Sequence, residues 1–508
     1  MLFHELAFLY VFMPLTISIA IWLGRKESKK LFIYFLCLVS LVFYGWWNPS
    51  FVPLLFSSIL FNYFLGNYLQ GCQYPARRRI LLGVGVSANL LVLVCFKYLD
   101  FLGEIIGGAF SIDVNLPALE LPLGVSFFTF LQIAYIVDAA KGDADKDQFA
   151  PYFLFVTFFP HLIAGPLVHH RSLISQFSQM MTNVYENVAV GFTIFVIGLF
   201  KKLVLADTVV YWSDSVFNGA ASGIPPSIID SWVGAISFTL LIYFDFSSYS
   251  DMAIGLSKML GIRLPENFNS PYKATSIIEF WRRWHITLSS FLRDYLYVPL
   301  GGNRKGPIRR YLNLVIVMLL AGLWHGASWQ FVLWGGLHGA YLLVNHLWRG
   351  QRLLVLPSPV GLILTFLAVV FAWVPFRAET WQASILVFKG MAGFNGLILP
   401  VHYGEMMPQD LVRFLGNLGV EFATLSVYGG FNQLFLLGLL LMFVWFAPNT
   451  QQLMGRYDVV LDKRAATIPM WMCWKPGIIS GCVVAFVAAY LWMLGLQGKA
   501  GEFIYFQF

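Results

Sequence analysis

The chain is poor in charged residues along its whole length, and this limits what it can fold into. Only 12% of its 508 residues are Asp, Glu, Lys or Arg, whereas 58% are hydrophobic. A soluble domain carries roughly 25% charged residues. A chain with so little charge cannot cover a surface that faces water, but it suits a protein whose outer surface faces lipid. We therefore expect an integral membrane protein.

Apolar stretches recur near the length of roughly 20 residues that crosses a bilayer. Those between about residues 119 and 345 are shorter, and Pro, Gly or ionisable residues interrupt them. The pattern predicts an all-α, polytopic membrane protein with roughly 11 to 13 transmembrane or re-entrant helices. The clearest candidate spans are residues 7–24, 31–47, 51–69, 80–96, 362–374 with its flanks, 435–448 and 478–494.

Positive charge is concentrated in short connecting loops. Cytoplasmic loops carry an excess of Lys and Arg, so we expect these loops inside the cell and the N-terminus outside. The first apolar segment lacks a Lys/Arg-rich start and is interpreted as a retained helix. The net charge of +7 is not gathered on one soluble face, so we expect no nucleic-acid partner. The loops include Arg77, Arg78, Arg79, Arg304, Lys305, Arg309 and Arg310.

No low-complexity linker divides the chain, and we interpret residues 1–508 as a single membrane domain. Residues 1–117 are expected to form N-terminal transmembrane helices and residues 349–508 C-terminal ones. Residues 118–348 are expected to form a core of broken and re-entrant helices. Irregular backbone at membrane depth is tolerated only where protein or a water-filled cavity surrounds it. The functional site is therefore predicted in this middle region.

A first candidate site residue lies in the stretch SIIEFWRRWHITLSSFLRDYLYVPLGGNRK, residues 276–305. Ser276 followed by Glu279 is a capping-box pattern that begins a helix. Apolar residues at helical spacing then predict one amphipathic helix that continues to Pro299, with His285 on its apolar face. The alternative is a structural histidine that only bonds a neighbouring carbonyl.

A second candidate, His325, lies in MLLAGLWHGASWQFVLWGGLHG, where it follows an apolar run of helical length. An ionisable residue in such surroundings is costly and is a functional candidate by default. The adjacent Gly326 would let a substrate or another backbone approach closely. The alternative is a buried histidine that only bonds a neighbour. His338, farther along, is interpreted as structural.

Other polar groups occur at apparent membrane depth. Asp245 and Asp251 lack the spacing of an ion site, and we expect a hydrogen-bonded scaffold beside the histidines. His169 and His170 adjoin Arg171, which predicts a solvated loop. The five cysteines form no CxxC or Cys/His pattern, and we expect no metal site.

Taken together, five stretches resemble the membrane-bound O-acyltransferase family, above all its bacterial branch of alginate O-acetylases and teichoic-acid D-alanylation proteins. They occur in the family's order, and the resemblance covers most of residues 1–350. Ser248 is a departure, because close relatives usually carry Gly there. The stretches are LPLGVSFFTFLQIAYIVD (121–138), FFPHLIAGPLV (158–168), YFDFSSYSDMAIG (243–255), EFWRRWHITLSSFLRDYLYVPLGGNRKG (279–306) and GLWHG (322–326).

The resemblance implies helices around a central tunnel, with His325 as the active-site histidine and His285 as a second polar residue lining that tunnel. We expect His325 to act as general base and Trp324 to lie beside the reactants. On this hypothesis Arg282, Arg283 or Lys305 meets the phosphates of the acetyl donor.

The resemblance further implies a location in the bacterial inner membrane and acetyl transfer across it to an exported polysaccharide. The expected donor is cytoplasmic acetyl-CoA, with no cofactor held by the protein, and periplasmic acetyltransferase proteins are the expected partners. Alginate is the favoured acceptor, with cellulose and peptidoglycan as alternatives. A proton-coupled transporter and a non-catalytic scaffold of an export complex are the rival interpretations.

Overall fold

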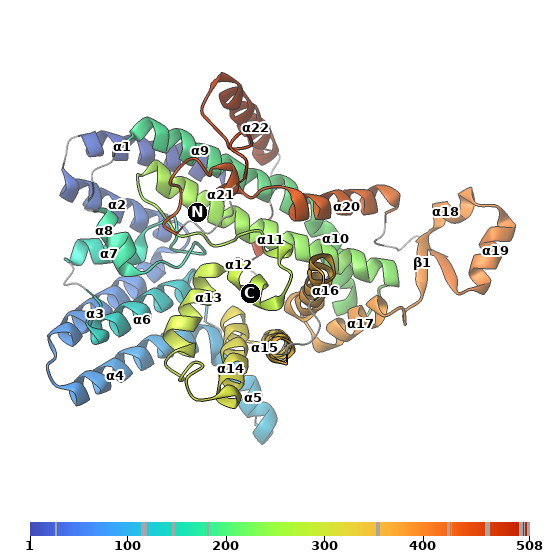
Figure 1. The fold of residues 1–508 in the computed structure, drawn as a ribbon, viewed down its shortest axis with the longest axis horizontal. Helices are drawn as coiled ribbons and strands as arrows, with labels where there is room; N and C mark the ends of the chain where they lie inside the picture. The colour runs from blue at the N-terminus through green and yellow to red at the C-terminus, as the bar shows by residue number, and fades with distance from the viewer. Residues whose placement is uncertain are drawn as a thin grey trace.

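The structure is a computed structural model of the full chain. It describes residues 1–25, 28–112, 119–144, 148–177, 179, 182–351, 356–423, 427, 429–462, 468–496, 501 and 503–504. Within these residues the regular secondary structure is almost entirely helical, with a broad helical body and a small unit that projects from one end (Figure 1). The prediction of an all-α membrane protein is confirmed, with one small strand pair in addition.

The helices of the first half of the chain are α1 (Met13–Arg25), α2 (Lys29–Gly45), α3 (Val52–Gly71), α4 (Pro75–Leu93), α5 (Leu99–Phe110), α6 (Val125–Lys141), α7 (Phe149–Thr157), α8 (His170–Phe177), α9 (Val184–Phe200), α10 (Asp207–Ala221) and α11 (Ile228–Met259). Those of the second half are α12 (Ile277–Arg283), α13 (Ile286–Leu292), α14 (Pro307–His325), α15 (Trp329–Gly350), α16 (Ser358–Arg377), α17 (Trp381–Met391), α18 (Val401–Met406), α19 (Gln409–Asn417), α20 (Phe431–Phe446), α21 (Thr450–Leu453) and α22 (Ile478–Leu496).

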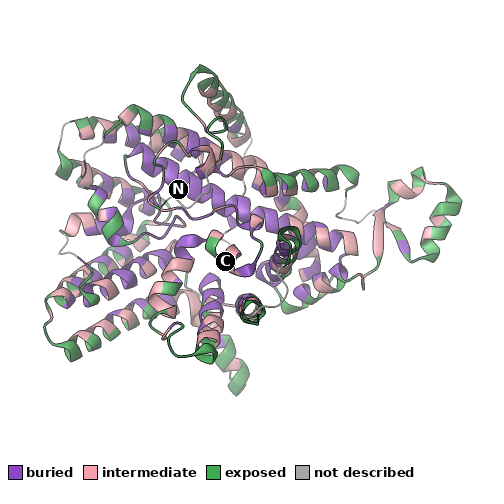
Figure 2. Ribbon diagram, viewed as in Figure 1, coloured by how far each residue is buried: buried purple, intermediate pink, exposed green. Residues whose placement is uncertain are grey.

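Within the described residues, eight helical stretches are long and apolar enough to cross a membrane. One more apolar helix, α20, is shorter. The share of each span that is buried inside the protein differs widely, from 6% in α22 to 78% in α11. Apolar residues that the protein leaves uncovered need lipid around them, so α22 faces the bilayer while α11 lies in the centre (Figure 2).

Small residues let the central helices approach closely. A side chain on Gly191 of α9 would meet the carbonyl oxygen of Gly255 on α11 at 2.5 Å, and the reverse distance is 2.6 Å. Helices α14 and α15 pack in the same way, because Gly322 faces the carbonyl of Phe331 and Gly335 that of Met318. Close backbone contact of this kind is the usual means of helix association in membranes.

The predicted division at residue 117 falls in residues 113–118, which lie outside the described residues. The other division, at residue 348, falls inside α15. Packing crosses both positions: Phe3, Leu491 and Phe503 belong to one buried apolar cluster.

The projecting unit consists of β1 (Leu397–Pro400), β2 (Val420–Ala423) and the two helices between them (Figure 1). The strands pair in parallel, with Leu397 opposite Val420. No residue of α19 is buried, and Leu411, Phe414 and the C-cap residue Leu418 are all exposed. Among the described residues, none of the aromatic rings that contact His285 and His325 comes from this unit.

Candidate active site

His325 is the last residue of α14, and its side chain is only 5% exposed. Three aromatic rings enclose the imidazole, with centroids 4.9 Å (Trp324), 5.1 Å (Trp334) and 5.2 Å (Phe376) away. No described residue bonds its Nδ1, although this atom is sealed from the surface. A buried imidazole nitrogen without a protein partner is available to a substrate.

Gly326 adopts an extended backbone conformation, and its lack of a side chain leaves room for the ring of Phe331. A Cβ at this position would lie 2.1 Å from the ring of Phe331. The close approach expected for Gly326 is therefore made by an aromatic side chain. Phe331 in turn packs edge-on against Phe376, which is one wall of the histidine environment.

The prediction of one helix from Ser276 to Pro299 is wrong. The chain forms α12, a sharp turn at His285, then α13 and a short π-helical turn, Arg293–Tyr297. Ser276 does cap α12 by accepting the backbone N–H of Glu279. The Glu279 carboxylate, however, accepts from Thr275 and Arg283, so the capping box is only half formed.

His285 adopts a left-handed backbone conformation, with φ of 40° and ψ of 56°. This region is unfavourable for residues other than glycine and persists where the surroundings enforce it. Two backbone hydrogen bonds on either side of the turn hold it: Asn269 N–H to Arg283 O and Ile286 N–H to Asn267 O, both 2.9 Å. The turn directs the imidazole into the core, where it is 2% exposed.

Trp324 connects the two histidines. Its ring centroid lies 4.9 Å from that of His325 and 6.1 Å from that of His285. It also stacks on Phe130 of α6, at 5.5 Å. Three residues that the sequence placed at the site are thus brought together from two segments about 40 positions apart.

Substitution of His285 separates its backbone role from its side-chain role. His285→Gly and His285→Asn suit the left-handed conformation, whereas His285→Ala does not. We expect the Ala variant to be about 1 kcal/mol less stable than the Gly variant. All three should lose acetyl transfer if the imidazole takes part in it. Thermal unfolding in detergent and O-acetyl content check the two effects, and equal stability of Ala and Gly variants would contradict the strain.

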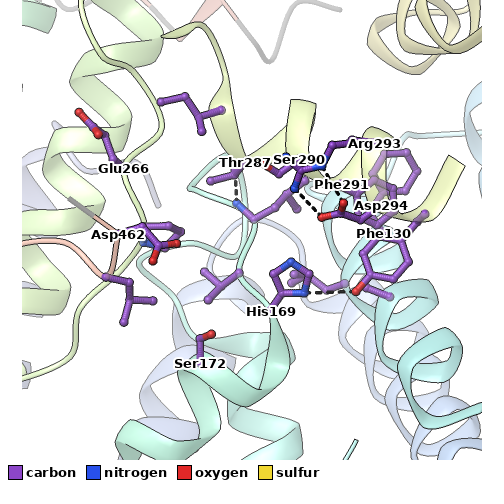
Figure 3. A pocket seen from close by; sticks show the side chains of 18 residues that line it. Phe130, His169, Ser172, Glu266, Thr287, Ser290, Phe291, Arg293, Asp294 and Asp462 are labelled. Carbon is purple, nitrogen blue, oxygen red and sulfur yellow. Dashed lines mark hydrogen bonds and ion pairs between the residues drawn. The ribbon is translucent and has the colours of Figure 1, made fainter. Parts of the chain in front are cut away.

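A polar pocket opens beside these residues (Figure 3). Phe130, Phe291, Ile286 and Thr287 are among its lining residues, and Ile286 and Thr287 directly follow His285 in the chain. The remaining lining residues include His169, Ser172, Glu266, Ser290, Arg293, Asp294, Tyr295 and Asp462. Neither catalytic candidate lines it, because Phe130 and then Trp324 lie between the pocket and His325.

One wall of the pocket carries a hydrogen-bonded cluster that the sequence did not indicate. Tyr295 donates to Asp138 Oδ2 at 2.7 Å, and its oxygen lies 3.2 Å from His169 Nδ1. Burial and the neighbouring Asp138 raise the pKa of Tyr295 above its usual range. His170 is buried, with Nδ1 3.6 Å from Asp138, so the prediction of a solvated loop is wrong for His170 and right only for the exposed His169.

The three basic residues proposed for the donor phosphates lie outside this pocket. Arg282 and Lys305 are exposed. Arg283 is bound to Glu279, with Nη2 2.7 Å from Oε1. Burial alone would raise the pKa of Glu279, but bonds from Thr275 and Arg283 hold it below its usual value. Arg293 is the basic residue that does line the pocket. It is also ion-paired, with Nε 2.7 Å from Asp294 Oδ1, but its side chain is 59% exposed, so the guanidinium stays accessible from the pocket.

The polar residues of α11 form a bonded scaffold, as the sequence analysis expected. Asp251 accepts from Lys201, Thr450 and Gln451. Asp245 is paired with Lys202, at 2.9 Å. Within the described ranges, no group of three or more His, Cys, Asp or Glu side chains is placed to hold a metal ion.

His338 of α15 packs behind the site and not in it. Its Nδ1 accepts a hydrogen bond of 3.3 Å from the indole N–H of Trp281, and its ring stacks on Phe280. It contacts Trp334, which separates it from His325. This arrangement agrees with a structural role.

The fold and the site together define a polytopic membrane protein with a histidine centre enclosed by its helices and a polar pocket beside it. The model of the MBOAT, membrane-bound O-acyltransferase, family matches residues 6–374. The chain therefore belongs to the membrane-bound O-acyltransferase family and is an acyltransferase. The resemblance inferred from the five stretches is confirmed, and the transporter and scaffold interpretations are set aside.

Curated relatives extend over most of the chain. It is 40% identical over 449 residues to the peptidoglycan O-acetyltransferase of Helicobacter pylori, covering 82% of this chain and 84% of the relative. It is also 40% identical over 437 residues to a probable alginate O-acetylase of Pseudomonas aeruginosa, covering 84% and 81%. The teichoic acid D-alanyltransferase of Bacillus subtilis is more distant, at 26% over 279 residues, or 51% and 69%.

Proposed function

We propose that the protein takes acetyl from a cytoplasmic thioester, acetyl-CoA, and passes it across the bacterial inner membrane for O-acetylation of an exported polysaccharide. The observation that carries this proposal is the imidazole of His325, buried among three aromatic rings with Nδ1 unbonded by the described residues. The names of the relatives supply the acyl group and the class of acceptor. Two of them, each 40% identical to this chain, act on peptidoglycan and alginate.

In the proposed reaction, His325 removes the proton of an acceptor hydroxyl as that oxygen attacks the thioester carbonyl. The carbon–sulfur bond breaks, and the proton passes from His325 to the departing sulfur, leaving an acetyl ester and free coenzyme A. His285 donates a hydrogen bond to the oxyanion as it develops. Acid–base assistance of this kind is worth roughly 10²–10⁴-fold in rate.

The polar pocket is the proposed entrance for the donor. By the positive-inside rule, the loop with Arg304 and Lys305 faces the cytoplasm, and this loop closely follows the pocket residues Arg293 and Tyr295 in the chain. The acetyl end must pass Phe130 and Trp324 to reach His325, which requires these rings to move. Periplasmic acetyltransferase proteins are the proposed partners on the other side.

Deletion of the gene tests this function directly. We expect O-acetyl groups to disappear from one exported polymer, and the polymer that loses them identifies the acceptor as alginate, peptidoglycan or cellulose. Binding of acetyl-CoA to the purified protein in lipid nanodiscs, measured by calorimetry, tests the donor. Unchanged O-acetylation of all three polymers would overturn the proposal.

Substitution of basic residues locates the donor phosphates. We expect Arg293→Ala to raise the KM for acetyl-CoA about 10-fold, because a charge-assisted hydrogen bond contributes roughly 1.5–3 kcal/mol. Arg282→Ala and Lys305→Ala are the matched variants outside the pocket. If they raise KM more than Arg293→Ala does, the phosphates lie at the surface loop and not in the pocket.

A further inference from the structure

Lys97 lies inside a membrane-spanning stretch, Pro75–Phe110, where a π-helical turn, Val94–Tyr98, joins α4 to α5. Its ammonium group donates to the carbonyl oxygens of Trp324 at 2.7 Å and of His325 at 2.9 Å. The next residue, Tyr98, donates its hydroxyl to the carbonyl of Leu323 at 2.8 Å. Two adjacent side chains thus bind three consecutive carbonyls at the end of α14.

These carbonyls need partners because they end a helix. The last four C=O groups of a helix have no partner within it, and water is absent from the hydrocarbon region of a bilayer. The C-terminal end of a helix also carries a partial negative charge, which the Lys97 ammonium opposes. A lysine at membrane depth is costly in itself and marks a functional position by default.

The contact of Lys97 with these carbonyls matters because of the residues to which they belong. The backbone that Lys97 holds belongs to His325 itself and to Trp324, the residue that separates His325 from His285. The chain turns immediately afterwards, since Gly326 is extended and only a long hydrogen bond of 3.4 Å joins it to Gly322. Hydrogen bonding within the helix therefore holds the end of α14 only weakly. The two hydrogen bonds from Lys97 hold the backbone there in place.

We propose that Lys97 is a positioning residue for His325, which acts by fixing the last turn of α14 so that the imidazole keeps its place between Trp334 and Phe376. Lys97 reaches the reaction through the backbone of His325. The inference rests on the proposed acetyl transfer. It assigns a role to an intramembrane charge that lies more than 200 residues from the histidine in the chain.

The chain provides a matched control. Lys273 binds the carbonyl of Ala447 at 2.7 Å, immediately after the end of α20. Lys273→Met therefore removes the same kind of bond, from a lysine to a carbonyl at a helix end, but at the end of α20 and not of α14. Both lysines are half-buried, so an effect of Lys97→Met that Lys273→Met does not share comes from the place of the bond and not from the loss of a lysine–carbonyl bond as such.

The experiment compares Lys97→Met, Lys97→Arg and Lys273→Met in membrane vesicles that contain the complete acetylation system. Thiol release from acetyl-CoA gives kcat and KM, and a thioether analogue of acetyl-CoA counts folded binding sites. We expect Lys97→Met to lower kcat per binding site on the order of 10²-fold, with KM within about 2-fold of wild type, because small displacements of a catalytic group have effects of this size. Lys97→Arg, which keeps the charge and the donors, should restore much of the rate, and Lys273→Met should leave kcat unchanged.

The outcomes distinguish a failure of the proposed function from a failure of the role assigned to Lys97. If wild-type vesicles release no thiol, the proposed function fails and this assignment with it. If the wild type is active and Lys97→Met has the same kcat per binding site as Lys273→Met, the positioning role is overturned while the proposed function stands. A fall in the number of binding sites with unchanged kcat would likewise make Lys97 a stability residue only.

Discussion

His325→Ala is expected to abolish O-acetylation of the exported polysaccharide while the protein remains folded in the membrane. The imidazole is the proposed general base, and its loss removes assistance worth roughly 10²–10⁴-fold. His325→Gln, which keeps much of the volume between the aromatic rings, should be equally inactive and more stable. The measurement is the O-acetyl content of the polymer in cells with matched membrane levels of each variant.

His161→Ala is the control for loss of a buried imidazole. His161 is 1% exposed, and its Nε2 lies 3.1 Å from the carbonyl oxygen of Phe155. We expect it to reduce stability but to retain acetyl transfer per folded molecule. Wild-type acetylation by His325→Ala would show that His325 is structural and that the proposed chemistry is wrong.

Lys202→Met is expected to have the largest effect on stability. The Lys202 ammonium lies 2.9 Å from Asp245 and 3.1 Å from Asp207, and Lys202 and Asp245 are at most 2% exposed. Removing one partner of a buried ion pair leaves an uncompensated charge, which costs about 3–5 kcal/mol. The chain end is affected as well, because Asp245 also accepts the backbone N–H of Ile504 and Lys202 lies over the ring of Phe503.

Lys201→Met is the matched variant one position away. Its partner Asp251 keeps hydrogen bonds from Thr450 and Gln451 when the lysine is lost, so a smaller loss of stability is expected. Combining Lys202→Met with Asp245→Asn removes the more deeply buried of the two stranded carboxylates, Asp207 being the other, and should recover part of the loss. Thermal unfolding in detergent measures all three, and an equal effect of Lys201→Met and Lys202→Met would contradict the argument.

The broken stretch around His285 shows where sequence patterns fail. Apolar spacing from Trp281 to Leu292 is that of a continuous helix, and nothing local in the sequence marks His285 as a turn. The turn exists because Asn267 and Asn269 bind the backbone on either side of it. These residues lie 14 or more positions earlier in the chain. The spacing of apolar residues within one helix therefore does not show that they turn the backbone at His285.

The pocket beside the site was missed for a similar reason. Asp138, His169 and Tyr295 come from three separate segments, and each by itself resembles an ordinary residue at the end of a helix or in a loop. The basic residues that the sequence favoured are the conspicuous ones, Arg282, Arg283 and Lys305. Arg282 and Lys305 are exposed and Arg283 is bound to Glu279, which only the folded chain reveals.

The sequence by itself determined the class of protein, and it singled out His285 and His325 as candidate site residues. Scarcity of charge and the recurrence of apolar stretches follow directly from the solvent the chain must face, and an ionisable residue within such a stretch is costly enough to be conspicuous. Tertiary structure alone decided how His325, Trp324 and His285 meet, which charges pair, and that Lys97 binds the end of the histidine's helix. Those outcomes depend on contacts between segments up to about 230 residues apart in the chain. Local spacing and composition do not reveal the free energy of such contacts.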